Sequence, residues 1–210
     1  MELLLYSCYS LNKIVTIRGG SVDSGTVLQK VFPISTIVFS KTDNPEILWP
    51  LVNLISTLIT KCQFDTTIII NSIESSSLNK LIMNESEVLN EALCDMFKNF
   101  LCIIPRNKPA QAVFQLVYHF LNYHIPRTDS SIHEKIIHLW YISIREFSSV
   151  NNCSAQYYEL FQNHFKRCLF RKTPTILYIL EEYMLLRLIE ADLNALVEIV
   201  YEFYQEAEEL

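Results

Sequence analysis

Glycine is almost missing from this chain. The 210 residues include only Gly19, Gly20 and Gly25, and none of the 185 residues after Gly25 is a glycine. Tight hairpin turns and phosphate-cradling loops need glycine, because its backbone adopts positive φ without steric cost. The absence predicts helices beyond residue 25 and excludes Walker-type and dinucleotide-binding loops from that part of the chain.

Cysteine pairs at redox or metal-binding spacing are also lacking. Six cysteines lie at positions 8, 62, 94, 102, 153 and 168, and none forms a CxxC pair. The N-terminal run has an acidic second residue and only a short apolar stretch, which is atypical of a signal peptide. We therefore expect an intracellular protein, nuclear or cytoplasmic, with reduced thiols. Cys94 and Cys102 share one predicted helix and are expected to be small core residues.

Long apolar runs are absent as well. The most apolar uncharged run covers residues 47–60, which is only 14 positions, and it contains Pro50 and Asn53. A helix that spans a bilayer needs about 20 consecutive apolar residues. We therefore expect a soluble protein with no membrane partner.

Catalytic motifs are lacking, although four of the five histidines lie between residues 119 and 138. The HExxH zinc motif places two histidines four apart, on one face of a helix. In HEKIIH, His133 and His138 are five apart, which rotates them by about 140°. Glu134 is expected to cap the helix, with His133 in an exposed first turn. We predict no catalytic residue, no cofactor and no metal ligand, and leave open a site that joins His119 to His138.

Charge is present but unevenly distributed. The net charge is −6, yet residues 98–172 carry ten basic and four acidic residues, and residues 181–210 carry nine acidic residues and one arginine. The densest basic run is KRCLFRK, residues 166–172. Its cations can bind phosphate groups on a protein or a nucleic acid, or they can be neutralised by a helix C-terminus and the acidic chain end. The candidate partner or phosphate contacts are Lys166, Arg167, Arg171 and Lys172.

Capping residues and apolar periodicity predict a row of helices from residue 43 onward. Short polar side chains at helix starts accept hydrogen bonds from first-turn N–H groups. Asn44 opens one apolar run, and capping boxes at Asn84 with Glu87 and at Ser131 with Glu134 open two others. Helix ends are expected near residues 105 and 126, which are both prolines.

The predicted helices are apolar around much of their circumference, so each must be covered on more than one side. Helix pairs recur at roughly 40 to 45 residues, which is typical of HEAT-type repeats. We therefore predict an all-α fold of antiparallel helix pairs, either a HEAT-like α-solenoid or a compact helical bundle. The helical domain is expected to cover residues 43–210.

The N-terminal segment, residues 1–42, has a different composition. Its runs LLLYSCY, KIVTIR and VLQKVFPISTIVF are rich in β-branched and aromatic residues, which favours strands joined by turns. Residues 1–17, which include the first two runs, could also form a buried helix that ends at Gly19 and Gly20, because periodicity does not decide for short apolar runs. Strand and helix therefore both stay open for residues 1–42. Residues 66–73 share the ambiguity, with helix favoured.

Residues 110–162 resemble the C-terminal helical region of the ATR-interacting protein family. The similarity lies in AQAVFQLVYHFLNYH, EKIIHLWYISIRE and a sparse set of matching positions: Leu139, Ile142, Ser143, Arg145, Glu146, Cys153 and Gln162. The resemblance implies a non-catalytic helical repeat that docks on the helical solenoid of a large checkpoint kinase, which responds to single-stranded DNA. The family's N-terminal acidic segment and coiled coil have no counterpart here.

The sequence thus predicts a non-catalytic helical scaffold or adaptor that binds another protein, with a checkpoint kinase in the DNA damage response as the partner that the resemblance implies. The alternative is a helical module that binds phosphate or nucleic acid through residues 166–172. The two differ in salt dependence, because phosphate binding weakens as salt rises.

Overall fold

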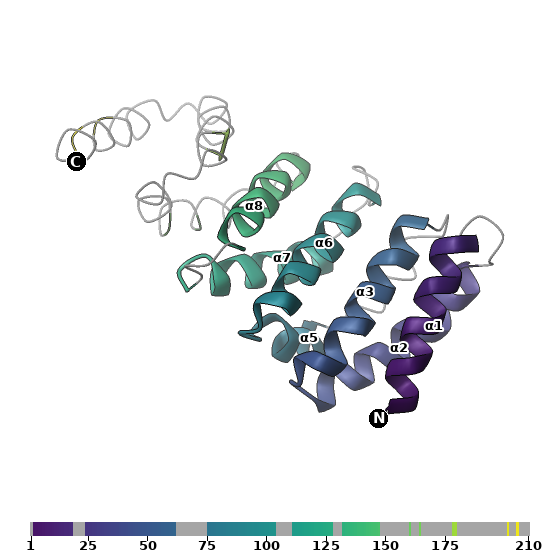
Figure 1. The fold of residues 1–210 in the computed structure, drawn as a ribbon. Helices are drawn as coiled ribbons and strands as arrows, with labels where there is room; N and C mark the ends of the chain where they lie inside the picture. Colours follow the sequence, from purple (N-terminus) through teal and green to yellow (C-terminus); the bar gives the residue numbers. More distant parts are fainter. Residues whose placement is uncertain are drawn as a thin grey trace.

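The computed structural model describes residues 2–18, 24–61, 75–103, 111–127 and 132–147, and the isolated residues 160, 164, 178, 179, 201 and 205. Every regular element in these ranges is an α-helix, so the predicted all-α fold is confirmed (Figure 1). The helices are α1 (Glu2–Arg18), α2 (Ser24–Lys41), α3 (Pro45–Lys61), α5 (Ser75–Ile82), α6 (Glu87–Ile103), α7 (Gln111–His124) and α8 (His133–Phe147).

The helices lie in two layers. One layer runs α1, α3, α6, α8, with each helix packed on the next, and the other runs α2, α5, α7 (Figure 1). Contacts of α2 with α3 and of α7 with α8 join the layers. Helices of the first layer begin at residues 2, 45, 87 and 133, which is close to the predicted interval. The choice between a HEAT-like α-solenoid and a compact helical bundle stays a prediction.

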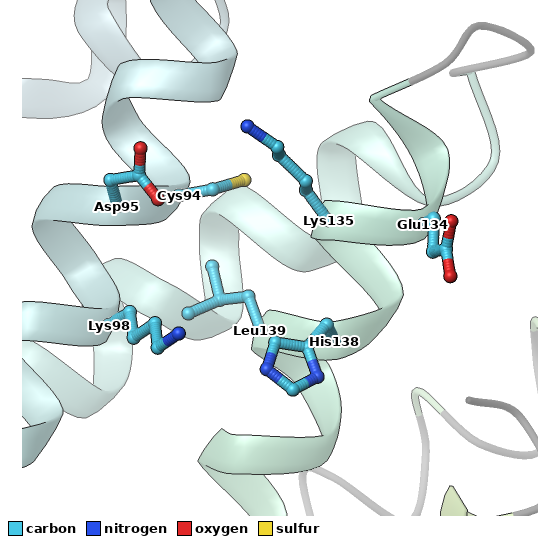
Figure 2. Close-up of a pocket in the computed structure, with 7 residues that line it drawn as sticks. All are labelled: Cys94, Asp95, Lys98, Glu134, Lys135, His138 and Leu139. Carbon is cyan, nitrogen blue, oxygen red and sulfur yellow. The ribbon is translucent and has the colours of Figure 1, made fainter.

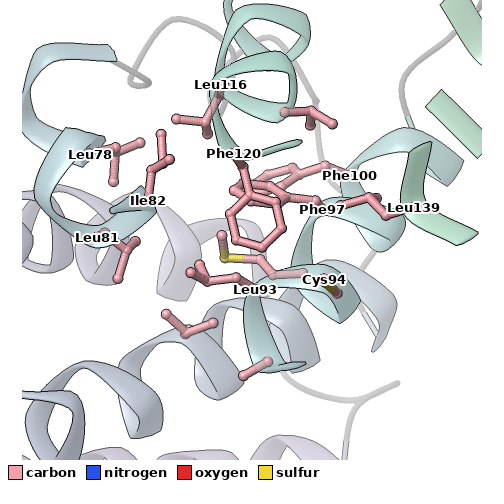
Figure 3. Close-up of a cluster of buried hydrophobic side chains, with 14 of the residues drawn as sticks. Leu78, Leu81, Ile82, Leu93, Cys94, Phe97, Phe100, Leu116, Phe120 and Leu139 are labelled. Carbon is pink, nitrogen blue, oxygen red and sulfur yellow. The ribbon is translucent and has the colours of Figure 1, made fainter. Parts of the chain in front are cut away.

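The core lies between the two layers and continues from α1 to α8. On α3, ten of 17 residues are buried, because α1 and α6 cover its sides and α2 covers its back. Further along, Phe97 of α6 and Phe120 of α7 meet edge to face, with ring centroids 5.2 Å apart. Figure 3 shows this part of the core, where side chains of α5, α6, α7 and α8 converge.

The strand interpretation of residues 1–42 is wrong for the part that the structure describes, and the helix alternative holds. Both α1 and α2 contribute to the common core, through Cys8 and Val15 on α1 and Phe32 and Phe39 on α2. Pro33 lies inside α2, and its side chain is exposed. Tertiary packing thus outweighs the β-propensity of these runs.

The capping predictions are correct for α3 and displaced for α6. Asn44 Oδ1 accepts a hydrogen bond from Glu46 N at 3.0 Å, as expected at the start of α3. At α6, the first helical hydrogen bond runs to Ser86 O, so Ser86 takes the cap position that was assigned to Asn84. Asn84 instead forms an Asx turn with Ser86 N and donates from Nδ2 to Asp43 O at 2.7 Å. This bond joins the connector before α6 to the connector before α3.

No helix among the described residues is both long and apolar enough to cross a bilayer. Residues 66–73 lie outside the described part of the chain. The predicted boundary at residue 42 falls at the start of the connector between α2 and α3, and the helices on its two sides pack against each other.

Candidate functional site

The basic residues predicted to contact a partner or phosphate, Lys166, Arg167, Arg171 and Lys172, lie outside the described residues. Of the positions that carry the family resemblance, Cys153 and Gln162 lie outside them too. On α8, Leu139 and Ser143 are buried, and the Ser143 hydroxyl donates to Leu139 O at 2.7 Å. Both residues therefore serve packing, whereas Arg145 is exposed.

The four clustered histidines have different environments. His124 is 3% exposed, and its Nε2 lies 2.6 Å from Ile82 O, which ties the end of α7 to α5. His133 is 6% exposed, so the expectation of an exposed first turn is wrong. His119 and His138 are exposed on α7 and α8. Within the described ranges, no group of three or more His, Cys, Asp or Glu side chains is arranged to hold a metal ion.

A pocket of about 380 Å³ lies between α6 and α8 (Figure 2). Three residues of α6 line it on one side and four residues of α8 on the other: Cys94, Asp95, Lys98, Glu134, Lys135, His138 and Leu139. Positive and negative side chains alternate around it. Lys135 forms an ion pair with Glu91, which lies one turn before Asp95 on α6. The pocket thus combines a thiol, an imidazole and balanced charges.

Electrostatics make this pocket a poor catalytic centre. Burial raises the pKa of the Cys94 thiol far above its ordinary value, and the charge of Asp95 adds to the effect. A thiol nucleophile needs the opposite shift, because only the thiolate reacts. Desolvation and nearby Lys98 lower the pKa of His138, so its imidazole is neutral at pH 7. Cys94 therefore acts as the small core residue that the sequence predicts, whereas Cys102 is exposed and that prediction is wrong.

The largest exposed apolar side chains of the first layer lie on α1. Leu3, Tyr6, Ile14 and Ile17 are 84%, 78%, 50% and 71% exposed. At 100° per residue, they fall within about 80° of one another around the helix, in a stripe directed away from buried Cys8 and Val15. We call this stripe the outer face of α1. Scattered apolar residues are normal on a surface, whereas large apolar side chains aligned on one helix face are a feature of interaction surfaces.

The outer face is exposed because, among the described helices, α1 is the end of its layer. Within the first layer, α1 packs only on α3, whereas α3 is held between α1 and α6. Figure 1 shows α1 at the edge of the array, with no described helix on its far side. On α2, Ile34 and Ile37 are each 54% exposed.

Sequence reasoning missed this face, because it treated residues 1–17 as strand or fully buried helix. The signal was present: positions 3, 6, 14 and 17 recur at helical spacing on one side, and Cys8 and Val15 lie on the other. A helix with two apolar faces has one face for its own core and one for a second neighbour. No family model, curated protein or solved structure matches the chain.

Proposed function

We propose that the protein is a non-catalytic helical scaffold that binds another protein. The observation that carries this proposal is the outer face of α1, where four large apolar side chains are at least half exposed. Burial of one such side chain stabilises a complex by about 1 to 2 kcal/mol, after the exposed fraction is considered. Four of them form a cluster large enough to act as the anchor of an interface.

The chemistry of the α6–α8 pocket supports a non-catalytic role. Burial holds its thiol protonated, so the pocket offers no activated nucleophile. A two-layer helical array, in contrast, is an architecture whose extended surfaces serve binding.

The partner class rests on the resemblance of residues 110–162 to the ATR-interacting protein family. This resemblance favours a large kinase with its own helical solenoid, in a nuclear DNA damage response. Arg145 is an exposed position among the matching residues and would contact such a kinase directly. Co-expression with the kinase solenoid should yield a complex, and Arg145→Glu should weaken it. The control Lys80→Glu changes an exposed charge on α5 and should leave the affinity unchanged. Equal affinities of the two variants for the kinase would contradict this part of the proposal.

The test of scaffold function compares proteins retained by the full chain with those retained by the double variant Tyr6→Glu, Ile17→Glu. Both side chains are exposed, so the variant should melt at the same temperature. The proposal predicts that the wild type retains a protein that the variant does not retain. When this protein and the wild-type chain are each purified and then mixed, they should bind again. Identical retention by the two chains would contradict it.

The second candidate function, phosphate or nucleic-acid binding through residues 166–172, is favoured by four basic residues in seven positions. Binding to single-stranded DNA or RNA should weaken steeply between about 50 and 200 mM salt. Arg167→Glu with Arg171→Glu should abolish it, whereas Arg127→Glu, an exposed cation on another connector, should leave most of it. Absence of binding at low salt would dismiss this candidate.

A further inference from the structure

The exposed positions of α1 are symmetric about Ser10. Leu3 lies seven residues before Ser10 and Ile17 lies seven after it, whereas Tyr6 lies four before and Ile14 four after. All five side chains are exposed, and Ser10 lies in the middle of the outer face. The set of positions is therefore mapped onto itself when the helix direction is reversed about Ser10.

This symmetry is what a two-fold interface requires. In a dimer with a two-fold axis, the same patch of both copies meets, and each contact occurs twice. If two α1 helices pack antiparallel across an axis at Ser10, Leu3 of one copy faces Ile17 of the other, and Tyr6 faces Ile14. The contacts extend over about 21 Å of helix at a rise of about 1.5 Å per residue.

The centre and the rim of the face fit the same arrangement. Ser10 is small, so it allows the helix axes to approach to the usual separation of about 8 to 10 Å. Lys13 is exposed beside the stripe, and it lies three residues after Ser10. Its counterpart under the two-fold operation is Ser7, which is exposed and uncharged. The lysines of the two copies therefore do not face each other.

The area of the face indicates a weak dimer. Taking about 180 Å² for a fully exposed side chain of this size, the exposed fractions of the four apolar residues amount to about 500 Å² per copy. Two copies would bury about 1,000 Å², which is the lower limit for a specific interface. A micromolar, concentration-dependent equilibrium is expected at this size.

We propose that the outer face of α1 binds a second copy of this chain, as an antiparallel α1–α1 pair around a two-fold axis at Ser10. This inference rests on the proposed function and names the occupant of the same surface. The chain would then present two helical arrays, one on each side of the axis, so that a partner bound elsewhere on the array is held twice.

The first experiment is sedimentation velocity of the full chain from about 1 to 200 µM. The proposal predicts a mass that rises from 24.5 kDa toward twice that value. Because each copy carries a net charge of −6, added salt should strengthen the dimer modestly, by screening repulsion. A mass of one chain at every concentration would overturn the inference.

The second experiment locates the axis with introduced cysteines. At the expected axis separation, the Cα atoms at Ser10 would lie about 4 to 5 Å apart, within disulfide range. Under mild oxidation with diamide, Ser10→Cys should give a covalent dimer whose cross-link joins position 10 to position 10. The control Thr16→Cys is also at an exposed position on α1 but off the outer face, and it should not cross-link above the wild-type background. Equal cross-linking of both variants would overturn the inference.

These results separate the inference from the proposed function. A monomeric chain that binds a different protein through Tyr6 and Ile17 overturns the inference and leaves the scaffold function standing. A dimer whose Tyr6→Glu, Ile17→Glu variant stays folded but becomes monomeric supports the inference. A monomer that binds nothing through this face overturns both.

Discussion

Helices α1 and α3 have the same length and lie side by side in one layer, yet they differ sharply in burial. Both have 17 residues, and both are rich in apolar side chains. Ten residues of α3 are buried, whereas among the described side chains of α1 only Cys8 and Val15 are. The difference arises from position: among the described helices of this layer, α3 has a neighbour on each side and α1 has one. The side of α1 that corresponds to the α6-covered side of α3 is exposed.

The largest expected effect separates the two helices directly. Leu58 of α3 is 0% exposed, and Leu58→Ala should destabilise the fold by about 2 to 5 kcal/mol, because it removes buried contacts and leaves a cavity. The matched change on α1, Leu3→Ala, should alter the free energy of unfolding by less than about 0.5 kcal/mol, since Leu3 is 84% exposed. Urea denaturation at low micromolar protein measures both. A Leu3→Ala cost as large as that of Leu58→Ala would show that α1 is covered in the monomer.

A serine on each helix sharpens the comparison. Ser56 of α3 accepts a hydrogen bond from Asn99 Nδ2 of α6 at 2.8 Å. This bond lies on the side of α3 that α6 covers, and the corresponding side of α1 is exposed. Ser56→Ala should cost about 1 kcal/mol, because the half-buried amide loses its partner. Ser10→Ala on the outer face should be neutral or slightly stabilising, since alanine has the higher helix propensity. Equal costs in the same denaturation assay would contradict the difference between the helices.

The contrast between buried and exposed positions recurs on α7, in the pH dependence of stability. Burial lowers the pKa of His124, against a weaker opposing effect of its bond to Ile82 O, so the folded chain holds it neutral. Because the unfolded chain binds the proton more readily, stability should be constant above the ordinary pKa of 6.5 and fall as pH decreases below it. His124→Gln, which can still donate to Ile82 O, should flatten this fall.

The control for this prediction is His119→Gln, at an exposed position on the same helix. His138, whose pKa is also lowered, contributes with the same sign, so some slope remains in the His124→Gln variant. Thermal melts at intervals of about half a pH unit, between about pH 5 and pH 8, measure how stability changes with pH. If stability falls with pH in His124→Gln as it does in the wild type, His124 is protonated as readily in the folded chain as in the unfolded chain, which contradicts the prediction.

The smallest effect is expected at the ion pair between α6 and α8. Lys135 and Glu91 are about half exposed, and side chains of this kind contribute little because water and salt screen them. Lys135→Ala should change stability by less than about 0.5 kcal/mol at physiological salt. A loss above about 1 kcal/mol would mean that polar contacts, and not apolar ones, hold neighbouring helices of the layer together.

Much of the helical arrangement could be predicted from local chemistry. Asn44 and Pro45 mark the start of α3 as expected, and the interval between helix pairs follows from the spacing of apolar runs. These features depend on residues close in sequence. The cap of α6 was displaced because Asn84 uses its amide for a bond to Asp43 O, some 41 positions away, and no local rule reveals such a partner.

The state of residues 1–42 could not be predicted for a similar reason. The β-branched residues around Pro33 favour a strand, and Pro33 itself disfavours a helix interior. Contacts of α2 with α3 and α5 stabilise the helix against these local preferences. The apolar spacing of the outer face of α1 is visible in the sequence. The face could not be predicted because the position of α1 at the end of the described layer is not. The burial of His133 was missed because an exposed first turn is the usual environment, and packing decides otherwise.

Charge complementation across the two-fold axis tests the role of the outer face of α1 most directly. Tyr6→Glu and Ile14→Lys each place a charge in the apolar stripe, so each variant alone should sediment as a monomer at a concentration where the wild type is dimeric. When the two are mixed, the introduced carboxylate faces the introduced ammonium at one site, and the native Tyr6–Ile14 contact is kept at the other. The mixture should therefore form a dimer with one chain of each kind. A mixture that stays monomeric while the wild type dimerises, or single variants that dimerise unchanged, would contradict this role of α1.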